Sequence, residues 1–116
     1  MVANWGIPMR KFETGATRDT DANKLDFEGA MSPIALESLV AYMHRHRETP
    51  QGPRASDNWQ KGMPRDEYMK SMWRHFHEAW KLHRAGVVDD RQLEDALCGV
   101  WFNVQGYLHE LIKARG

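Results

Sequence analysis

The sequence has almost no cysteine and no excess of either charge. Cys98 is the only cysteine in 116 residues, so the chain forms no internal disulfide, which fits a reducing compartment. The 16 Lys and Arg residues balance the 16 Asp and Glu residues. This neutral balance argues against a protein that coats nucleic acid or binds an anionic membrane surface. No apolar run approaches the roughly 20 residues of a membrane-spanning helix.

Several familiar chemical motifs are also missing. The chain has no Cys-x-x-Cys or His-Glu-x-x-His spacing, which excludes the common zinc signatures. No glycine-rich loop follows a strand pattern, and no elbow motif surrounds a serine, which excludes P-loop, Rossmann and hydrolase-elbow sites. The opening residues lack the basic-then-apolar layout of a signal peptide. We therefore expect a cytoplasmic protein.

Helical periodicity dominates the chain from residue 32 onward. Ser32 and Pro33 are typical of a helix start, and the first predicted helix runs to about Arg47. The second begins near residues 64–66 and ends at Gly86. The third follows a possible capping box of Asp89 and Gln92 and ends near Lys113. No strand pattern competes, so the predicted fold class is all-α, a small domain of three main helices.

We expect one domain over residues 1–116, as the length allows only one core. Residues 1–31 are polar and rich in turn formers, and they predict a coil arm ahead of a helical core at 32–113. A long loop at 48–64 contains three prolines and two glycines. Loops of this length inside a compact domain are often functional.

Each of the two longer helices carries an apolar stripe at helical spacing. We expect these stripes to form the core or a subunit interface. The second predicted helix contributes Met69, Met72, Trp73, Phe76, Ala79 and Trp80, and the third contributes Leu93, Ala96, Leu97, Val100, Val104, Leu108 and Leu111.

Polar residues share a seam beside each stripe. The second helix aligns Tyr68, Ser71, His75 and Glu78, and the third aligns Asp95, Gly99, Asn103, Gly106 and Glu110. Each glycine inside a helix costs roughly 1 kcal/mol relative to alanine. The pair therefore indicates close approach of either another helix or a ligand. A seam of His and Glu side chains is otherwise typical of a solvated boundary or a salt-bridge face.

Six short segments then resemble a known family. They are Thr14–Arg18 (TGATR), Lys24–Gly29 (KLDFEG) with Ser32-Pro33, Asn58–Gly62 (NWQKG), Arg74-His75, Glu94–Cys98 (EDALC) and Gly106–Glu110 (GYLHE). In this order they resemble the small phage-borne domain at the N-terminus of dATP/dGTP diphosphohydrolases. That domain is related to the all-α MazG-like nucleotide pyrophosphatases. The resemblance covers about residues 13–112.

The resemblance implies hydrolysis of a purine deoxynucleoside triphosphate, dATP or dGTP, to monophosphate and pyrophosphate. MazG-like enzymes hold Mg²⁺ or Mn²⁺ on helix-borne carboxylates, arranged as Glu-Glu-x-x-Glu and then Glu-x-x-Asp. Glu78 and Asp95 match this pattern, whereas Arg74, His75 and Gln92 stand where the family places acids. The resemblance further implies a homo-oligomer, a dimer or a tetramer, in the cytoplasm of the infected host.

The implied metal ligands are Glu78, Asp95, Glu94 and His75, with His75, Glu78 and Asp95 as the catalytic residues. Magnesium prefers oxygen ligands, so a site short of carboxylates suits it poorly, whereas manganese tolerates an imidazole better. Glu37 or an acid from another subunit is a candidate for the missing charge.

Cations and one aromatic residue are the candidates for holding the substrate. Arg18, Lys24, Lys61 and Arg74 would contact the triphosphate, each with the alternative of being an ordinary surface cation. Trp59 would stack on the purine while Asn58 reads its edge. The alternative is a tryptophan that pins the loop to the core.

Three functions therefore stay open. The first is metal-dependent hydrolysis, the second is a catalytically silent nucleotide-binding protein that sequesters a nucleotide signal, and the third is a helical adaptor with a Met- and Trp-rich binding stripe. The expected partner in the first two is a purine nucleotide, with no nucleic-acid polymer and no membrane.

Overall fold

The computed structural model describes residues 9–11, 15, 17–19, 23–86 and 88–116. The chain divides into two compact units, Met1–Ser32 and Pro33–Gly116. Each unit is described by itself.

The first unit contains short elements where the sequence predicts only coil. Strand β1 (Met9–Lys11) pairs antiparallel with β2 (Thr17–Asp19). One helical turn, α1 (Phe27–Ala30), follows, and the Asp26 carboxylate caps it by accepting a hydrogen bond from the Gly29 amide at 2.8 Å. Strands of three residues are too short to show an alternating pattern, which is why the sequence does not reveal them.

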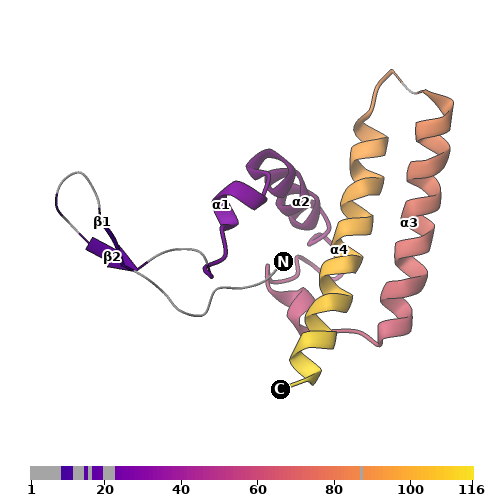
Figure 1. Ribbon diagram of the computed structural model, residues 1–116. Helices are drawn as coiled ribbons and strands as arrows, with labels where there is room; N and C mark the ends of the chain where they lie inside the picture. The colour runs from indigo at the N-terminus through magenta and orange to yellow at the C-terminus, as the bar shows by residue number, and fades with distance from the viewer. Residues whose placement is uncertain (1–8, 12–14, 16, 20–22, 87) are drawn as a thin grey trace. The chain divides into compact units, whose positions relative to one another are not determined.

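The second unit is all-α and contains the three main helices that the sequence predicts. They are α2 (Pro33–Arg45), α3 (Arg65–Ala85) and α4 (Arg91–Ala114), and a single 3₁₀ turn, η1 (Asn58–Lys61), lies in the long loop (Figure 1). Helix α3 ends at Gly86 in the left-handed conformation, as predicted. In the part of the chain that is described, no helix is long and apolar enough to cross a membrane.

The predicted capping box before α4 is wrong. Asp90, and not Asp89, is the N-cap residue, and its side chain makes no capping hydrogen bond. The Asp89 carboxylate instead accepts a hydrogen bond from the Arg91 amide at 3.1 Å. The helix therefore begins one residue later than the Asp89–Gln92 spacing requires.

Helices α3 and α4 form an antiparallel hairpin (Figure 1). Two glycines of α4 lie where side chains of α3 pack against it. The His75 ring lies where a Cβ atom on Gly99 would be, and the Tyr68 ring lies where one on Gly106 would be. Of the two possibilities that the sequence leaves open for these glycines, the structure thus shows helix packing. Rings from α3 fill the space that the missing side chains leave on α4.

The best-buried cluster joins α2 to α4. Leu39 and Tyr42 of α2 pack against Cys98 of α4, and Met43, Trp101 and Phe102 surround them. Cys98 is 5% exposed and packs as a small hydrophobic residue. Beside this cluster the Ser38 hydroxyl donates to the Glu94 carboxylate and lies 3.3 Å from the Cys98 sulfur.

The two apolar stripes are largely exposed. They therefore do not form the core of the chain, which is one of the two locations that the sequence predicts for them. On α3 only Ala79 of the stripe is buried, while Trp73 is 65% exposed and Trp80 50% exposed. On α4 only Ala96 is buried, while Leu97 and Leu108 are exposed. Periodicity identifies the apolar side of a helix, but it does not reveal whether another element covers that side.

Candidate functional site

A cavity of about 680 Å³ lies between α2, the loop before α3 and the middle of α4. Its walls come from the last turns of α2, from residues 54–63 and from Tyr68, Phe102 and Gln105. Leu39, Met43 and Phe102 make its floor apolar by linking it to the buried cluster. This volume is within the range of sites that bind small molecules.

The charged side chains that line the cavity have one sign. Arg47, Arg54 and Lys61 line it, together with His44 and His46, and none of its lining residues is Asp or Glu. The whole chain has no net charge, so this concentration of cations is a local feature. A cavity with such a lining attracts anions and repels free divalent cations.

A reciprocal pair of hydrogen bonds fixes the cavity wall. The Arg54 amide donates to the Arg47 carbonyl at 2.7 Å, and the Arg47 Nε donates to the Arg54 carbonyl at 2.7 Å. These two bonds join the C-terminal end of α2 to the loop. Two hydrogen bonds to main-chain carbonyls therefore hold the part of the cavity wall that contains Arg47 and Arg54.

Trp59 both pins the loop and lines the cavity. Its ring is half-buried and meets the His109 ring of α4 edge-on, with ring centres 4.9 Å apart. The same side chain lines the cavity, as do its neighbours Asn58 and Lys61. The two roles that the sequence leaves open for Trp59 are therefore compatible, since one ring has more than one surface.

Two tyrosines add neutral hydroxyl groups to the lining. Burial raises the pKa of Tyr42, and Asp95 raises it further. Burial also raises the pKa of Tyr68, with a second contribution from Glu110. Both phenols therefore stay protonated at neutral pH and can donate hydrogen bonds to an anion.

Of the other predicted substrate contacts, Arg74 does not line this cavity. Arg18 and Lys24 belong to the first unit, where Lys24 is exposed and the Arg18 side chain lies outside the described residues. Arg74 is exposed on α3. Of the predicted substrate-binding residues, the structure thus gathers Asn58, Trp59 and Lys61 at one place.

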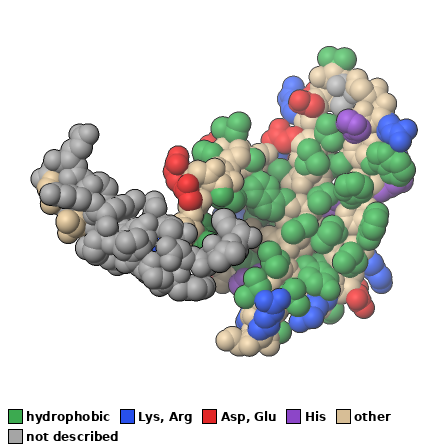
Figure 2. Space-filling view, in the orientation of Figure 1, with side chains coloured by type: hydrophobic (Ala, Val, Ile, Leu, Met, Phe, Trp, Pro, Cys, Tyr) green, Lys and Arg blue, Asp and Glu red, His purple; other side chains and the backbone are tan. Residues whose placement is uncertain are grey.

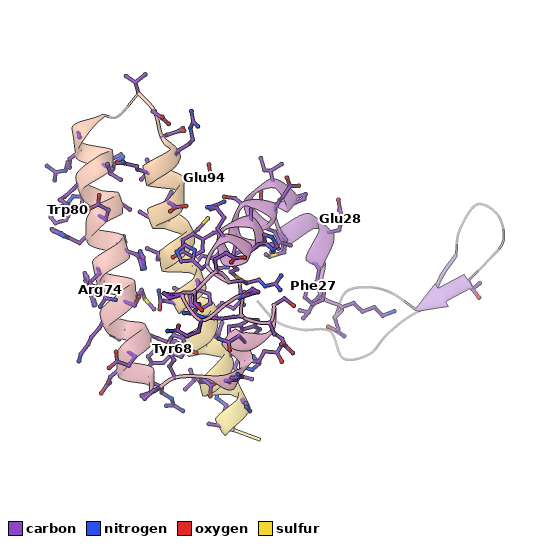
Figure 3. All side chains as sticks on the ribbon, turned by 180° about the vertical axis from the view of Figure 1, so that it is seen from behind. Phe27, Glu28, Tyr68, Arg74, Trp80 and Glu94 are labelled. Carbon is purple, nitrogen blue, oxygen red and sulfur yellow. The ribbon has the colours of Figure 1, made fainter. Side chains whose placement is uncertain are left out.

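The predicted acids are engaged in separate pairs. Glu78 pairs with Lys81 at 3.0 Å, Asp95 accepts from Arg45 at 2.7 Å, and Glu94 accepts from Ser38. Figure 3 shows Glu94 near the turn between α3 and α4, whereas Tyr68, which lines the cavity, lies at the other end of α3. A metal on Asp95 would have to displace the Arg45 guanidinium.

The carboxylates of one chain do not fit the implied metal. Among the described residues, no group of three or more His, Cys, Asp and Glu side chains is arranged to hold a metal ion. Glu37, the extra acid considered from the sequence, is exposed on α2. Magnesium needs several oxygen ligands around one point, and the described residues do not gather them.

His75, one of the predicted catalytic groups, has a lowered pKa. Burial lowers its pKa, and the charges of Arg74 and His46 lower it further, while Asp95 acts in the opposite direction. The imidazole therefore stays neutral at neutral pH. His75 and Asp95 lie within electrostatic reach of each other, and the ring packs over Gly99.

The lowered pKa of His75 predicts that stability falls in mild acid. The unfolded chain binds this proton near the ordinary pKa of 6.5, and the folded chain binds it only at lower pH. The free energy of unfolding should therefore decrease as the pH falls below about 6.5. His75→Phe keeps a ring over Gly99 and should flatten this slope in urea titrations at several pH values. His77→Phe, at an exposed position on the same helix, is the control and should leave the slope unchanged.

Sequence reasoning missed four of the five Lys, Arg and His residues that line the cavity. His44 and His46 look like surface residues, and Arg47 and Arg54 carry no motif. Basic residues in the last turn of a helix are common because they interact well with its dipole, so their presence near residue 45 gives little signal. The loop brings Arg54 back to Arg47, and these residues then line one cavity together with His44 and His46.

Comparisons with known proteins do not assign this chain to a family. No protein-family model matches the chain, no curated protein matches it, and no solved structure matches it.

Proposed function

We propose that the protein binds a purine nucleotide in the cavity between α2, the loop at 54–63 and α4. The observation that carries this proposal is the lining of the cavity. It contains two arginines, one lysine and two histidines, and it contains no Asp or Glu. A triphosphate is an anion of matching size and charge. Arginine and lysine bind phosphate oxygens through charge-assisted hydrogen bonds.

The base would lie against Trp59. The half-buried indole offers an aromatic surface, and base–aromatic stacking contributes about 1–3 kcal/mol. Asn58 is adjacent in the lining and carries both a donor and an acceptor, the two groups that the edge of a purine requires. The apolar floor of Leu39, Met43 and Phe102 excludes water from beneath the base.

Thermal unfolding in the presence of ligand tests this proposal. In EDTA, dATP or dGTP at a hundred times its dissociation constant should add about 2.7 kcal/mol of stability. For a chain of this size that corresponds to about 10 °C in Tm. Tripolyphosphate should give a smaller shift, and deoxyadenosine alone almost none. If millimolar dATP and dGTP both leave the Tm unchanged, the proposal is wrong.

Hydrolysis of the same nucleotide is the second candidate. The lowered pKa of His75 favours it, because a neutral imidazole is suited to accept a proton, although His75 does not line the cavity. It requires carboxylates beyond those that the described residues gather. Pyrophosphate release from the four dNTPs with Mg²⁺, with Mn²⁺ and with EDTA separates the two candidates. Metal-dependent release supports hydrolysis, and binding without release supports a silent nucleotide-binding protein.

A further inference from the structure

The arginines and the lysine of the cavity lining have no acidic partner among the described residues. No salt bridge there involves Arg47, Arg54 or Lys61. The Arg47 guanidinium uses its Nε for the Arg54 carbonyl, and one terminal nitrogen lies 3.5 Å from Nδ1 of His44. Elsewhere on the second unit both signs of charge occur, since Figure 2 shows Lys and Arg in blue and Asp and Glu in red on the side of the helices turned to the viewer. The cavity therefore holds positive charge that the described chain does not neutralise.

One carboxylate adjoins the lining without being part of it. The Glu110 carboxylate fills the space where a Cβ atom on Gly62 would lie, and it adds to the effect of burial in raising the pKa of Tyr68. Asp95, which lies within electrostatic reach of the lining residue Tyr42, already accepts a hydrogen bond from a guanidinium at 2.7 Å. A magnesium ion on nucleotide phosphates usually binds one or two carboxylates of the protein as well. The described lining residues supply none.

We propose that the cavity binds the nucleotide as its metal-free anion, with Arg47, Arg54 and Lys61 in the place of the magnesium ion. This inference rests on the proposed function and names the chemical species that the same site takes. Phosphate oxygens that leave water need a cation as partner, because an unpaired charge is costly away from solvent. In the metal complex that cation is Mg²⁺, and in the cavity it is a set of side chains that donate charge-assisted hydrogen bonds.

Magnesium that is already bound to the phosphates should oppose binding. The ion occupies phosphate oxygens that the side chains would contact, and it keeps several of its own waters. It also brings positive charge among Arg47, Arg54 and Lys61, and like charges repel one another. Mg²⁺ therefore competes with the cavity for the nucleotide. This effect is opposite to the role of the metal that the sequence resemblance implies.

Isothermal titration calorimetry with dATP and the full chain tests this proposal, in EDTA and in MgCl₂ at equal ionic strength. At a magnesium concentration that leaves about a tenth of the dATP metal-free, the dissociation constant should rise about tenfold, because only that fraction is able to bind. The control ligand is dAMP, whose single phosphate holds Mg²⁺ much more weakly. Its dissociation constant should change by less than about twofold.

Arg54→Gln shows whether the same species binds under both conditions. Among the described residues the Arg54 guanidinium has no hydrogen-bond or salt-bridge partner, and its main-chain bonds to Arg47 remain in the variant. The variant should raise the dATP dissociation constant about tenfold, by the same factor in EDTA and in Mg²⁺. Arg65→Gln is the matched control, because Arg65 is exposed at the start of α3 and does not line the cavity. It should change the dissociation constant by less than about threefold.

The outcomes separate this inference from the function on which it rests. Weaker dATP binding in Mg²⁺, with an equal loss for Arg54→Gln in both conditions, supports the inference. Binding that is equal or tighter in Mg²⁺ overturns it and leaves the nucleotide site in place. A smaller loss for Arg54→Gln in Mg²⁺ than in EDTA also overturns it, because the metal complex then binds too. No binding of dATP in either condition overturns the inference together with the proposed function.

Discussion

Gly106→Leu is expected to destabilise the protein by about 3 kcal/mol or more, because the site has no space for a side chain. A Cβ atom on Gly106 would overlap the Tyr68 ring, which is 1% exposed. Leucine is the better helix former by nearly 1 kcal/mol, so intrinsic propensity alone predicts the opposite sign. The measurement is urea unfolding at one fixed protein concentration.

A double substitution shows where the effect of Gly106→Leu arises. Tyr68→Ala removes the ring that occupies the space, so Gly106→Leu should cost much less in that background than in the wild-type protein. Gln92→Ala, at an exposed position on the same helix, is the control and should change the free energy of unfolding by less than about 0.5 kcal/mol. An equal cost of Gly106→Leu in both backgrounds would contradict the packing seen at the seam.

Lys61→Glu is expected to weaken nucleotide binding about 100-fold, or about 2.7 kcal/mol. The change removes one of three fixed cations from the cavity and places a carboxylate against the triphosphate. The effect should be larger for dATP than for dAMP, because the triphosphate carries more charge. Isothermal titration calorimetry in EDTA measures it without a contribution from metal binding.

Lys70→Glu is the matched control for this change. Lys70 is exposed on α3 and does not line the cavity, yet its substitution alters the net charge of the protein by the same amount. It should change the dATP dissociation constant by less than about threefold, since Lys70 does not line the cavity and salt weakens the effect of an exposed charge that makes no direct contact. Equal losses of dATP affinity in the two variants would mean that nucleotide binding depends on the net charge of the protein and not on the lining of the cavity.

The helices of this protein could be predicted because their ends carry local signals. Ser32-Pro33 and Gly86 mark positions that the structure places at a helix start and a helix end. Such signals depend on residues within one turn, and a sequence displays them directly. The capping box at Asp89 shows the limit of this reasoning, since a shift of one residue in the helix start removes it.

The candidate site depends on contacts between distant residues, which local patterns do not contain. Asp95 pairs with Arg45, 50 residues away, so its availability as a metal ligand could not be judged from α4 alone. Whether the apolar stripes are buried or exposed likewise depends on where α2 packs. By contrast, Asn58, Trp59 and Lys61 could be grouped in advance, because they are nearly consecutive in one short turn.

The way α2 attaches to the hairpin sets the order in which the chain assembles. Helices α3 and α4 are joined by a short turn, so their contacts close small loops and form quickly. The contacts of Ser38 with Glu94 and Cys98 close loops of more than 50 residues and form more slowly. We therefore expect the hairpin to form before α2 packs on it and completes the cavity.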